Sequence, residues 1–150
     1  MSRVLTFVNK EVNMRLVRLG KAQWEVLAVV DSRGHCQVLE FLKELGPSLF
    51  AVQRVLVKLL RERLPEEGPP THNPQLCKSL GEGIFELRRQ PKGPKLRLLF
   101  FYDEGHRIVF TNAFSKAETT PQAEIELARR LKEQYCVAKR LRRLQILEEI

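Results

Sequence analysis

The sequence predicts an α+β fold in which a mainly antiparallel sheet packs against helices. The main observation is a succession of three short apolar runs, at residues 84–89, 96–102 and 107–114. The peptides QPKGPK and DEGH separate these runs, and both are rich in residues that reverse a chain. Segments with apolar positions at helical spacing flank the runs on both sides. A chain of 150 residues with 43% hydrophobic content can bury one core, so we expect one domain.

The chain divides into three parts by its patterning. We expect residues 1–23 to be an N-terminal extension, residues 24–136 to form the domain, and residues 137–150 to be a basic helical tail. The extension shows no clear periodicity, so it is interpreted either as disordered or as an extra element. Met14 would serve as well as Met1 as a start, and residues 1–13 are therefore a disordered arm or an artefact of start-site choice.

The first half of the domain combines a strand with two helices. Residues 24–30, WEVLAVV, are β-branched and aromatic and end at a turn cluster, which is typical of a strand. Residues 37–45 carry apolar positions at helical spacing until Gly46 and Pro47 stop them. A second helix is predicted from Ser48, and the proline-rich residues 65–74 are predicted to be a loop.

The three apolar runs form an antiparallel meander with cations in unusual places. In the first run, Phe85 and Leu87 alternate with Glu86 and Arg88, which indicates a half-buried strand. The second run is apolar on both faces apart from Arg97, so it is predicted to be the middle strand. A guanidinium there must meet a carboxylate, reach the rim of the sheet or face an anion site. A structural salt bridge from Arg97 to Glu86 or Asp103 and an anion site are equally compatible with the pattern.

A last helix is predicted from Pro121 almost to the end of the chain. Thr120 is the expected N-cap, and Pro121 suits the first helical position. Leu127, Leu131, Tyr135 and Ala138 form the apolar stripe of this helix. Arg129, Arg130, Lys132, Lys139, Arg140, Arg142 and Arg143 make it strongly basic.

Charge and cysteine usage restrict the class of protein. A net charge of +8 favours phosphate polymers or an acidic protein as partner. The three cysteines lack CxxC spacing, which fits a reducing cytoplasm. The sequence contains no run of about 18 apolar residues, so no membrane span is expected. We expect no metal site, because His35 with Cys36 and His72 with Cys77 offer too few ligands.

Several motifs follow one another in a recognisable order. They are KSL at 78–80, GIFELR at 83–88, LRLL at 96–99, FSK at 114–116, TP at 120–121 and EI at 124–125. Together they resemble the phage-derived, HigB-type branch of the RelE toxin superfamily, and the resemblance covers residues 24–135. It implies a β-α-α-β-β-β-α fold.

The resemblance also implies a function, that of the toxin in a type II toxin–antitoxin pair. Such toxins cleave messenger RNA, commonly on the ribosome, without a metal or other cofactor. The cleavage needs an aligned ribose 2′-hydroxyl, a proton acceptor, a proton donor and cations around the phosphate. Arg88 and Arg97 fall where the family places basic strand residues, and we expect Arg97 to be the main phosphate stabiliser. Lys116 falls in an FxKK-like motif, where it would bind the phosphate or transfer a proton.

Further expectations concern the RNA contacts, the partners and the positions at which this sequence differs from the family pattern. Further RNA contacts are expected from Lys78, Arg89, Lys92, Lys95, Arg129 and Arg130. The expected partners are messenger RNA, the ribosome and an antitoxin of the helix-turn-helix type. Ala117 stands where many relatives carry a second basic residue, and no histidine is well placed as acid or base. Tyr135 could supply a hydroxyl, although its spacing favours the core. A non-catalytic RNA- or ribosome-binding domain on the same fold is therefore the alternative.

Overall fold

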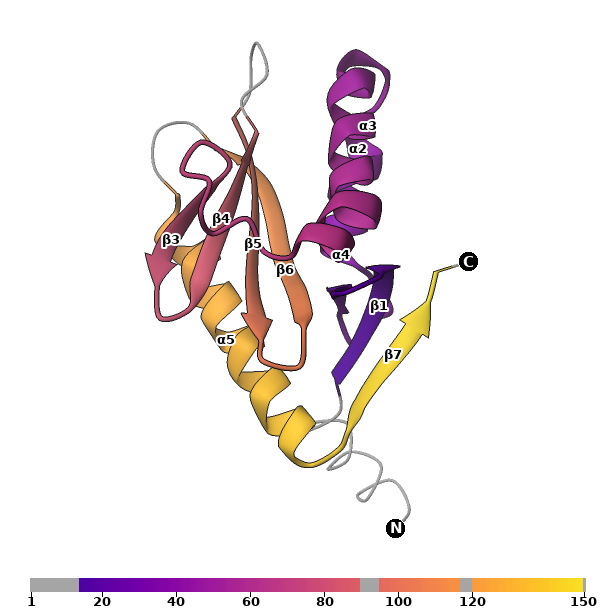
Figure 1. Ribbon diagram of the computed structural model, residues 1–150, viewed down its shortest axis with the longest axis vertical. Helices are drawn as coiled ribbons and strands as arrows, with labels where there is room; N and C mark the ends of the chain where they lie inside the picture. The colour runs from indigo at the N-terminus through magenta and orange to yellow at the C-terminus, as the bar shows by residue number, and fades with distance from the viewer. Residues whose placement is uncertain (1–13, 90–94, 117–119, 150) are drawn as a thin grey trace.

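A seven-stranded sheet runs through the computed structural model, which describes residues 14–89, 95–116 and 120–149 (Figure 1). The strands are β1 (Met14–Lys21), β2 (Glu25–Val30), β3 (Cys77–Gly81), β4 (Ile84–Arg89), β5 (Lys95–Asp103), β6 (Arg107–Lys116) and β7 (Leu144–Glu148). Their order across the sheet is β3-β4-β5-β6-β2-β1-β7. Neighbouring strands are antiparallel except for the parallel pairs β2–β6 and β1–β7. The sheet is therefore mostly antiparallel.

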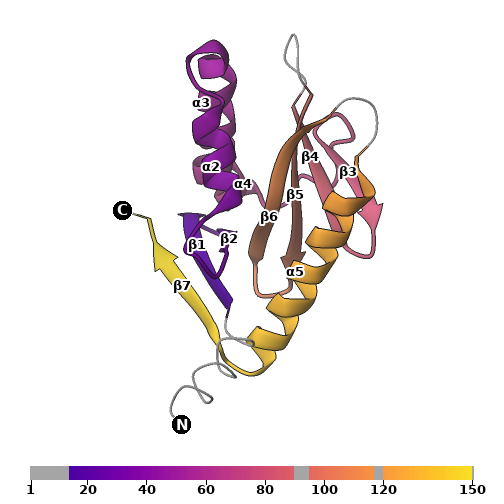
Figure 2. The same ribbon diagram turned by 180° about the vertical axis from the view of Figure 1, so that it is seen from behind.

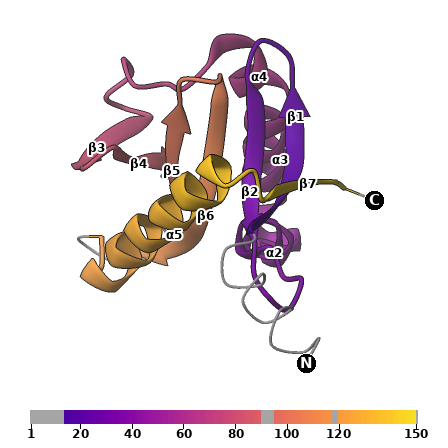
Figure 3. The same ribbon diagram turned by 90° about the horizontal axis from the view of Figure 1, so that it is seen from below.

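The helices lie on both sides of this sheet. They are α2 (Gln37–Glu44), α3 (Phe50–Lys58), α4 (Leu64–Glu67) and α5 (Gln122–Arg140). A 3-10 turn (Pro47–Leu49) precedes α3, and a π-helical turn (Leu59–Arg63) joins α3 to α4. Figure 2 shows α2, α3 and α4 grouped together, away from α5. Seen from below, α5 crosses β4, β5 and β6, whereas α3 lies behind β1 and β2 (Figure 3).

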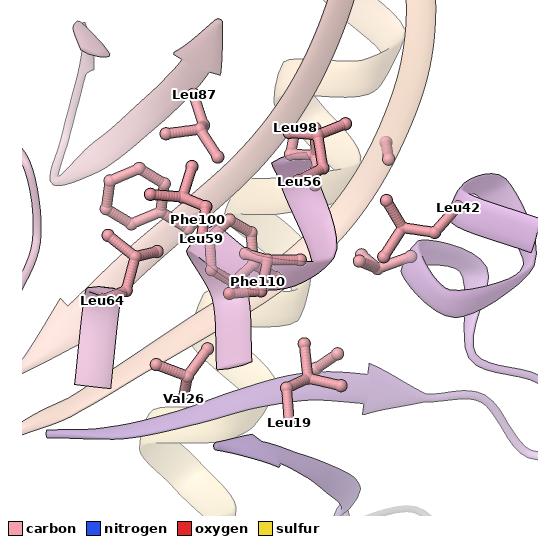
Figure 4. Packing of buried hydrophobic residues seen from close by; sticks show 14 of the residues in the cluster. Leu19, Val26, Leu42, Leu56, Leu59, Leu64, Leu87, Leu98, Phe100 and Phe110 are labelled. Carbon is pink, nitrogen blue, oxygen red and sulfur yellow. The ribbon is translucent and has the colours of Figure 1, made fainter. Parts of the chain in front are cut away.

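The hydrophobic core has one part on each face of the sheet. On the first face, Leu98, Phe100 and Phe110 of the sheet meet leucines of the helical segments from 56 to 64 (Figure 4). On the second face, Phe101 and Val109 pack with buried residues of α5. Because both faces are covered by helices, strand β5 is buried from Leu96 to Phe101. The predicted α+β class is confirmed.

The meander and the first helix lie where the sequence places them. Strands β4, β5 and β6 match the three apolar runs, and β5 is the middle strand of the three. The predicted segments β2-α2-α3-β4-β5-β6-α5 occur in this order along the chain. Strands β1, β3 and β7 are additions to that plan. Pro65, which was assigned to a loop, lies within the short helix α4.

The N-terminal part of the sheet contains residues that were assigned to an extension. Residues 1–13 lie outside the described part of the chain, but residues 14–21 form β1 beside β2. Gly20 lies at a shift in the register of this pair. A Cβ atom there would approach the Arg61 carbonyl oxygen to 2.6 Å, so only glycine allows the chain to pass so close to the helical segment. The sheet thus extends beyond the expected boundary at residue 24.

The C-terminal tail is only partly helical, which corrects the prediction for residues 137–150. Helix α5 ends at Arg140, and Arg142 adopts a φ of 58°, in the left-handed region. The chain then forms β7 parallel to β1. Leu144 and Ile146 alternate along β7 and pack against the core under α5. The gain from burying these two side chains favours a strand over a projecting helix.

The start of α5 also differs from the prediction. Pro121, and not Thr120, occupies the N-cap position, and no side chain caps the helix. The Thr120 hydroxyl donates instead to the carboxylate of Glu86 on β4. The hydroxyl therefore joins the sheet to the segment before α5.

Candidate functional site

Two of the predicted arginines lie opposite each other on neighbouring strands. Arg88 of β4 and Arg97 of β5 are direct partners in the antiparallel register. Alternation along β4 places Glu86 on the same face as Arg88, which is the face that α5 covers. Glu86 is 0% exposed. The meander therefore brings one buried carboxylate and two guanidinium groups together, and we call Glu86, Arg88 and Arg97 the arginine cluster.

Arg97 is the buried member of the arginine cluster. Its side chain is only 3% exposed, and its Nε lies 3.4 Å from Glu86 Oε1. Its Nη1 donates to the backbone oxygen of Leu96 at 2.9 Å and to that of Arg89 at 3.4 Å. Burial lowers the pKa of the Arg97 guanidinium, Glu86 opposes this effect and Arg88 adds to it. An arginine nevertheless stays protonated at neutral pH, so Arg97 is a fixed positive charge inside the protein.

Arg88 is the accessible member of the cluster. Its side chain is 25% exposed, and its Nε donates to Glu86 Oε1 at 3.2 Å. Glu86 binds this guanidinium through Nε, and a guanidinium has five donor hydrogens in a planar fork. The arrangement can therefore present Arg88 to an anion while Glu86 holds it in place.

Two further polar contacts, which the sequence did not reveal, link the sheet to α5 and to the segment before it. Asn112 of β6 is fully buried, and its Nδ2 donates to Glu124 Oε1 at 2.8 Å and to the Glu124 backbone oxygen at 3.2 Å. Thr120 binds Glu86, as described above. Neither residue belongs to a motif with catalytic spacing. The one signal was the presence of a polar residue, Asn112, within the apolar run of β6.

The other predicted basic residues are distributed around the arginine cluster. Lys95 and Lys116 are partners in the register between β5 and β6, so their backbones lie side by side. The Lys116 side chain and all of Lys92 lie outside the described part of the structure. Lys78 is exposed on β3, where its partner in the register is Glu86. Arg89 is half-buried at the end of β4.

The two predicted arginines on α5 have different surroundings. Arg129 forms an ion pair with Glu82, in the turn between β3 and β4. Lys132 of the same helix donates to the Glu82 backbone oxygen at 2.7 Å. Arg130 is exposed. Arg129 thus helps to attach the β3–β4 turn to α5, whereas Arg130 remains accessible to a ligand.

A second charged network lies at the other end of β5. The Tyr135 hydroxyl donates to Asp103, and Lys139 Nζ lies 3.1 Å from Asp103 Oδ2. Glu25 pairs with Arg107 at 2.9 Å and also with Arg18. Asp103 is therefore not the partner of Arg97. Tyr135 is 0% exposed, and burial raises the pKa of its hydroxyl well above the usual range, so it belongs to the core and is separate from the arginine cluster.

His35 and His106 have partners outside the arginine cluster. His35 pairs with Glu40 at 2.8 Å, and His106 stacks on Trp24 with ring centroids 4.7 Å apart. No group of three or more histidine, cysteine, aspartate or glutamate side chains in the described residues could hold a metal ion. Among the helices that the structure describes, none is both long enough and apolar enough to span a membrane.

These features define an α+β protein with a basic arginine cluster at one end of a mostly antiparallel sheet. Comparison with known protein families matches residues 40–133 to phage derived protein Gp49-like (DUF891). The match covers more than half of the chain, so the protein belongs to the phage-derived Gp49-like family. The matched region contains every residue of the arginine cluster. Searches of curated proteins and of solved structures found no match.

Proposed function

We propose that this protein is the toxin of a type II toxin–antitoxin system and cleaves messenger RNA on the ribosome. The observation that carries the proposal is the arginine cluster, in which a buried carboxylate holds an accessible arginine beside a basic strand end. Membership of a phage-derived family and the net charge of +8 support the same function. The sequence resemblance to HigB-type RelE toxins supplies the reaction class.

The cluster suggests different roles for its two arginines. Arg88 would contact the scissile phosphate, because its side chain is partly exposed. Arg97 would act on the phosphate without contacting it, since its side chain is 3% exposed and its Nη1 donates to two backbone oxygens. The buried positive charge of Arg97 would favour the charge that develops on phosphorus as the 2′-hydroxyl attacks. Lys116 would bind the phosphate or transfer a proton at the end of β6.

Inducible expression in a bacterial host tests this function directly. We expect growth arrest with new 5′ ends in messenger RNA, and we expect Arg88→Ala to reduce both effects at least about a hundredfold, as for loss of a group that stabilises transition-state charge. Arg33→Ala is the matched control, because Arg33 is exposed in the turn before α2. A harmless wild-type protein that cleaves no RNA in the presence of ribosomes would contradict the proposal.

The alternative function is a non-catalytic RNA- or ribosome-binding domain. It is favoured by Ala117, which replaces a second basic residue, and by the burial of Arg97. In that case the wild-type protein would cosediment with ribosomes in low salt and leave messenger RNA intact. A partner antitoxin, expected to be a small helix-turn-helix protein encoded nearby, would relieve growth arrest under the first function only.

A further inference from the structure

A cluster of aromatic side chains lies at the end of the sheet opposite the arginine cluster. Trp24 stacks on His106, with centroids 4.7 Å apart and planes 18° from parallel. Tyr102 meets Trp24 edge to face at 6.1 Å and also contacts Phe85 at 5.6 Å. Tyr102 is 42% exposed, and His106 is exposed as well. We call Trp24, Tyr102 and His106 the aromatic end.

The backbone at His106 is held in an unusual conformation. His106 has a φ of 62°, in the left-handed region, whereas the neighbouring Gly105 does not have a positive φ. A residue with a side chain thus takes the conformation that glycine adopts at lower cost. Histidine tolerates this region better than most residues, but the arrangement still requires compensation from its surroundings. The stacking of the imidazole on Trp24 provides such compensation.

Trp24 is fixed from its other side. A Cβ atom on Gly68 would lie 2.8 Å from Trp24 Nε1, and Gly68 has a φ of 83°. The indole is therefore wedged between the Gly68 backbone and the His106 ring. A rigid stack leaves little conformational entropy to lose when a further flat ring is added. The aromatic end is thus preorganised as a stacking surface.

A basic pocket adjoins this stacking surface. It has a volume of about 240 Å³, and its lining includes His106 together with Lys21, Glu25, Asp103, Arg107 and Lys139. Arg107 binds Glu25 and Lys139 binds Asp103, so the two carboxylates are neutralised. Lys21 is exposed and forms no ion pair with any residue that the structure describes. The lining of the pocket therefore has a net positive charge, which suits an anionic group such as a phosphate.

We propose that the aromatic end and its pocket bind an unpaired nucleotide of single-stranded RNA. The base would stack on Tyr102 or on the outer face of His106, and the phosphate would lie near Lys21. Stacking on exposed aromatic rings beside a basic groove is how proteins bind single strands without sequence preference. The net charge of +8 favours RNA over an apolar protein segment as the occupant.

This site is separate from the arginine cluster. Arg97 and Asp103 are six residues apart on β5, which corresponds to roughly 20 Å along an extended strand. Tyr102 alternates with Arg97 and Asp103, so its side chain lies on the opposite face of the sheet, whereas the pocket that Asp103 lines lies on the face of Arg97 at the other end of the strand. The site would hold RNA at a distance from the scissile phosphate. It does not require that the protein cleave RNA.

Binding of a labelled 12-nucleotide oligouridylate, measured by fluorescence anisotropy, tests the site. A 2′-O-methyl group on every ribose would block the attacking 2′-oxygen and so prevent cleavage, and Arg88→Ala would be used in parallel. We expect Tyr102→Ala and Lys21→Glu each to weaken binding by about five- to thirtyfold, in keeping with the loss of one stacked base or one phosphate contact. Arg88→Ala should leave the effect of Tyr102→Ala unchanged. A failure of catalysis would therefore not affect this result.

Matched controls and a second readout make the test specific. Phe50→Ala removes an aromatic ring that is 55% exposed on α3, and Lys43→Glu reverses an exposed lysine on α2. Trp24 is the single tryptophan, so its fluorescence should change on binding of the oligonucleotide, and this change should be lost in Tyr102→Ala at the same oligonucleotide concentration. Unchanged affinity of Tyr102→Ala, or equal losses in Phe50→Ala, would overturn the proposal, as would a preference for duplex RNA.

Discussion

Glu86 is the residue on which the arginine cluster depends. It is 0% exposed and accepts from Arg88 and Thr120 while pairing with Arg97. We predict that Glu86→Gln lowers the free energy of unfolding by about 3 kcal/mol, because it removes the buried negative charge that pairs with the Arg97 and Arg88 guanidinium groups. Urea denaturation at neutral pH measures this change. Glu104→Gln, in the exposed β5–β6 turn, should have almost no effect; equal effects of the two substitutions would show that Glu86 does not neutralise the arginines.

The sequence predicted which residues form the cluster but not their exposure. Alternation along β4 and the one charge within residues 96–102 singled out Glu86 and Arg97, but the sequence left Glu86 and Asp103 open as partners of Arg97, and the structure selects Glu86. Arg97 lies on the face of the sheet that α5 covers, and this helix begins 25 residues later in the sequence. Asn112 binds Glu124 of α5, and Thr120, in the segment before the helix, binds Glu86. These contacts join segments distant in sequence, and no local pattern encodes them. The sequence therefore could not predict that Arg97, which was expected to bind the phosphate, is buried.

Among the secondary-structure elements, β7 connects the end of α5 to the N-terminal edge of the sheet. Its parallel pairing with β1 is accompanied by ion pairs from Arg18 to Glu148 and from Arg61 to Glu149. We predict that Ile146→Ala lowers the free energy of unfolding by about 1 to 2 kcal/mol, because Ile146 is a partly buried side chain in the core under α5.

Gln145→Ala is the control for this strand, since Gln145 is exposed on the opposite face of β7. Thermal unfolding followed by circular dichroism should show a lower midpoint for Ile146→Ala only. If both variants unfold like the wild type, β7 does not contribute to the folded domain.

Elements with a clear period were predictable, and short elements were not. The meander strands are six to ten residues long and bounded by turn peptides, so their pattern was sufficient. Strands β3 and β7 have five residues each. Strand β7 follows α5 closely, and the helical spacing of apolar residues in α5 could continue through the residues of β7. Its partner, β1, lies about 130 residues away in the sequence, and only this non-local pairing selects the strand.

In the whole molecule, the proposed RNA contacts lie at two ends of one sheet. The arginine cluster faces α5 near the start of β5, and the aromatic end lies at the other end of that strand, with Tyr102 on the opposite face and the pocket beside His106 on the α5 face. An RNA chain that reaches both would have to follow the surface over roughly 20 Å, which several nucleotides can span. The net charge of +8 would attract the chain along this path.

This arrangement predicts that RNA affinity depends strongly on salt and that each phosphate contact contributes its own share of the slope. The logarithm of the association constant for the 2′-O-methyl oligouridylate should fall linearly with the logarithm of salt concentration, by about 0.7 for each phosphate that is neutralised. Lys78→Gln should reduce the slope by about 0.7, because Lys78 is exposed beside the arginine cluster. Lys43→Gln, an exposed lysine on α2, should leave the slope as it is in the wild type. Anisotropy titrations between about 50 and 300 mM potassium chloride measure both slopes. Equal reductions in the two variants would mean that RNA is attracted by the total charge of the protein and not by the surfaces proposed above.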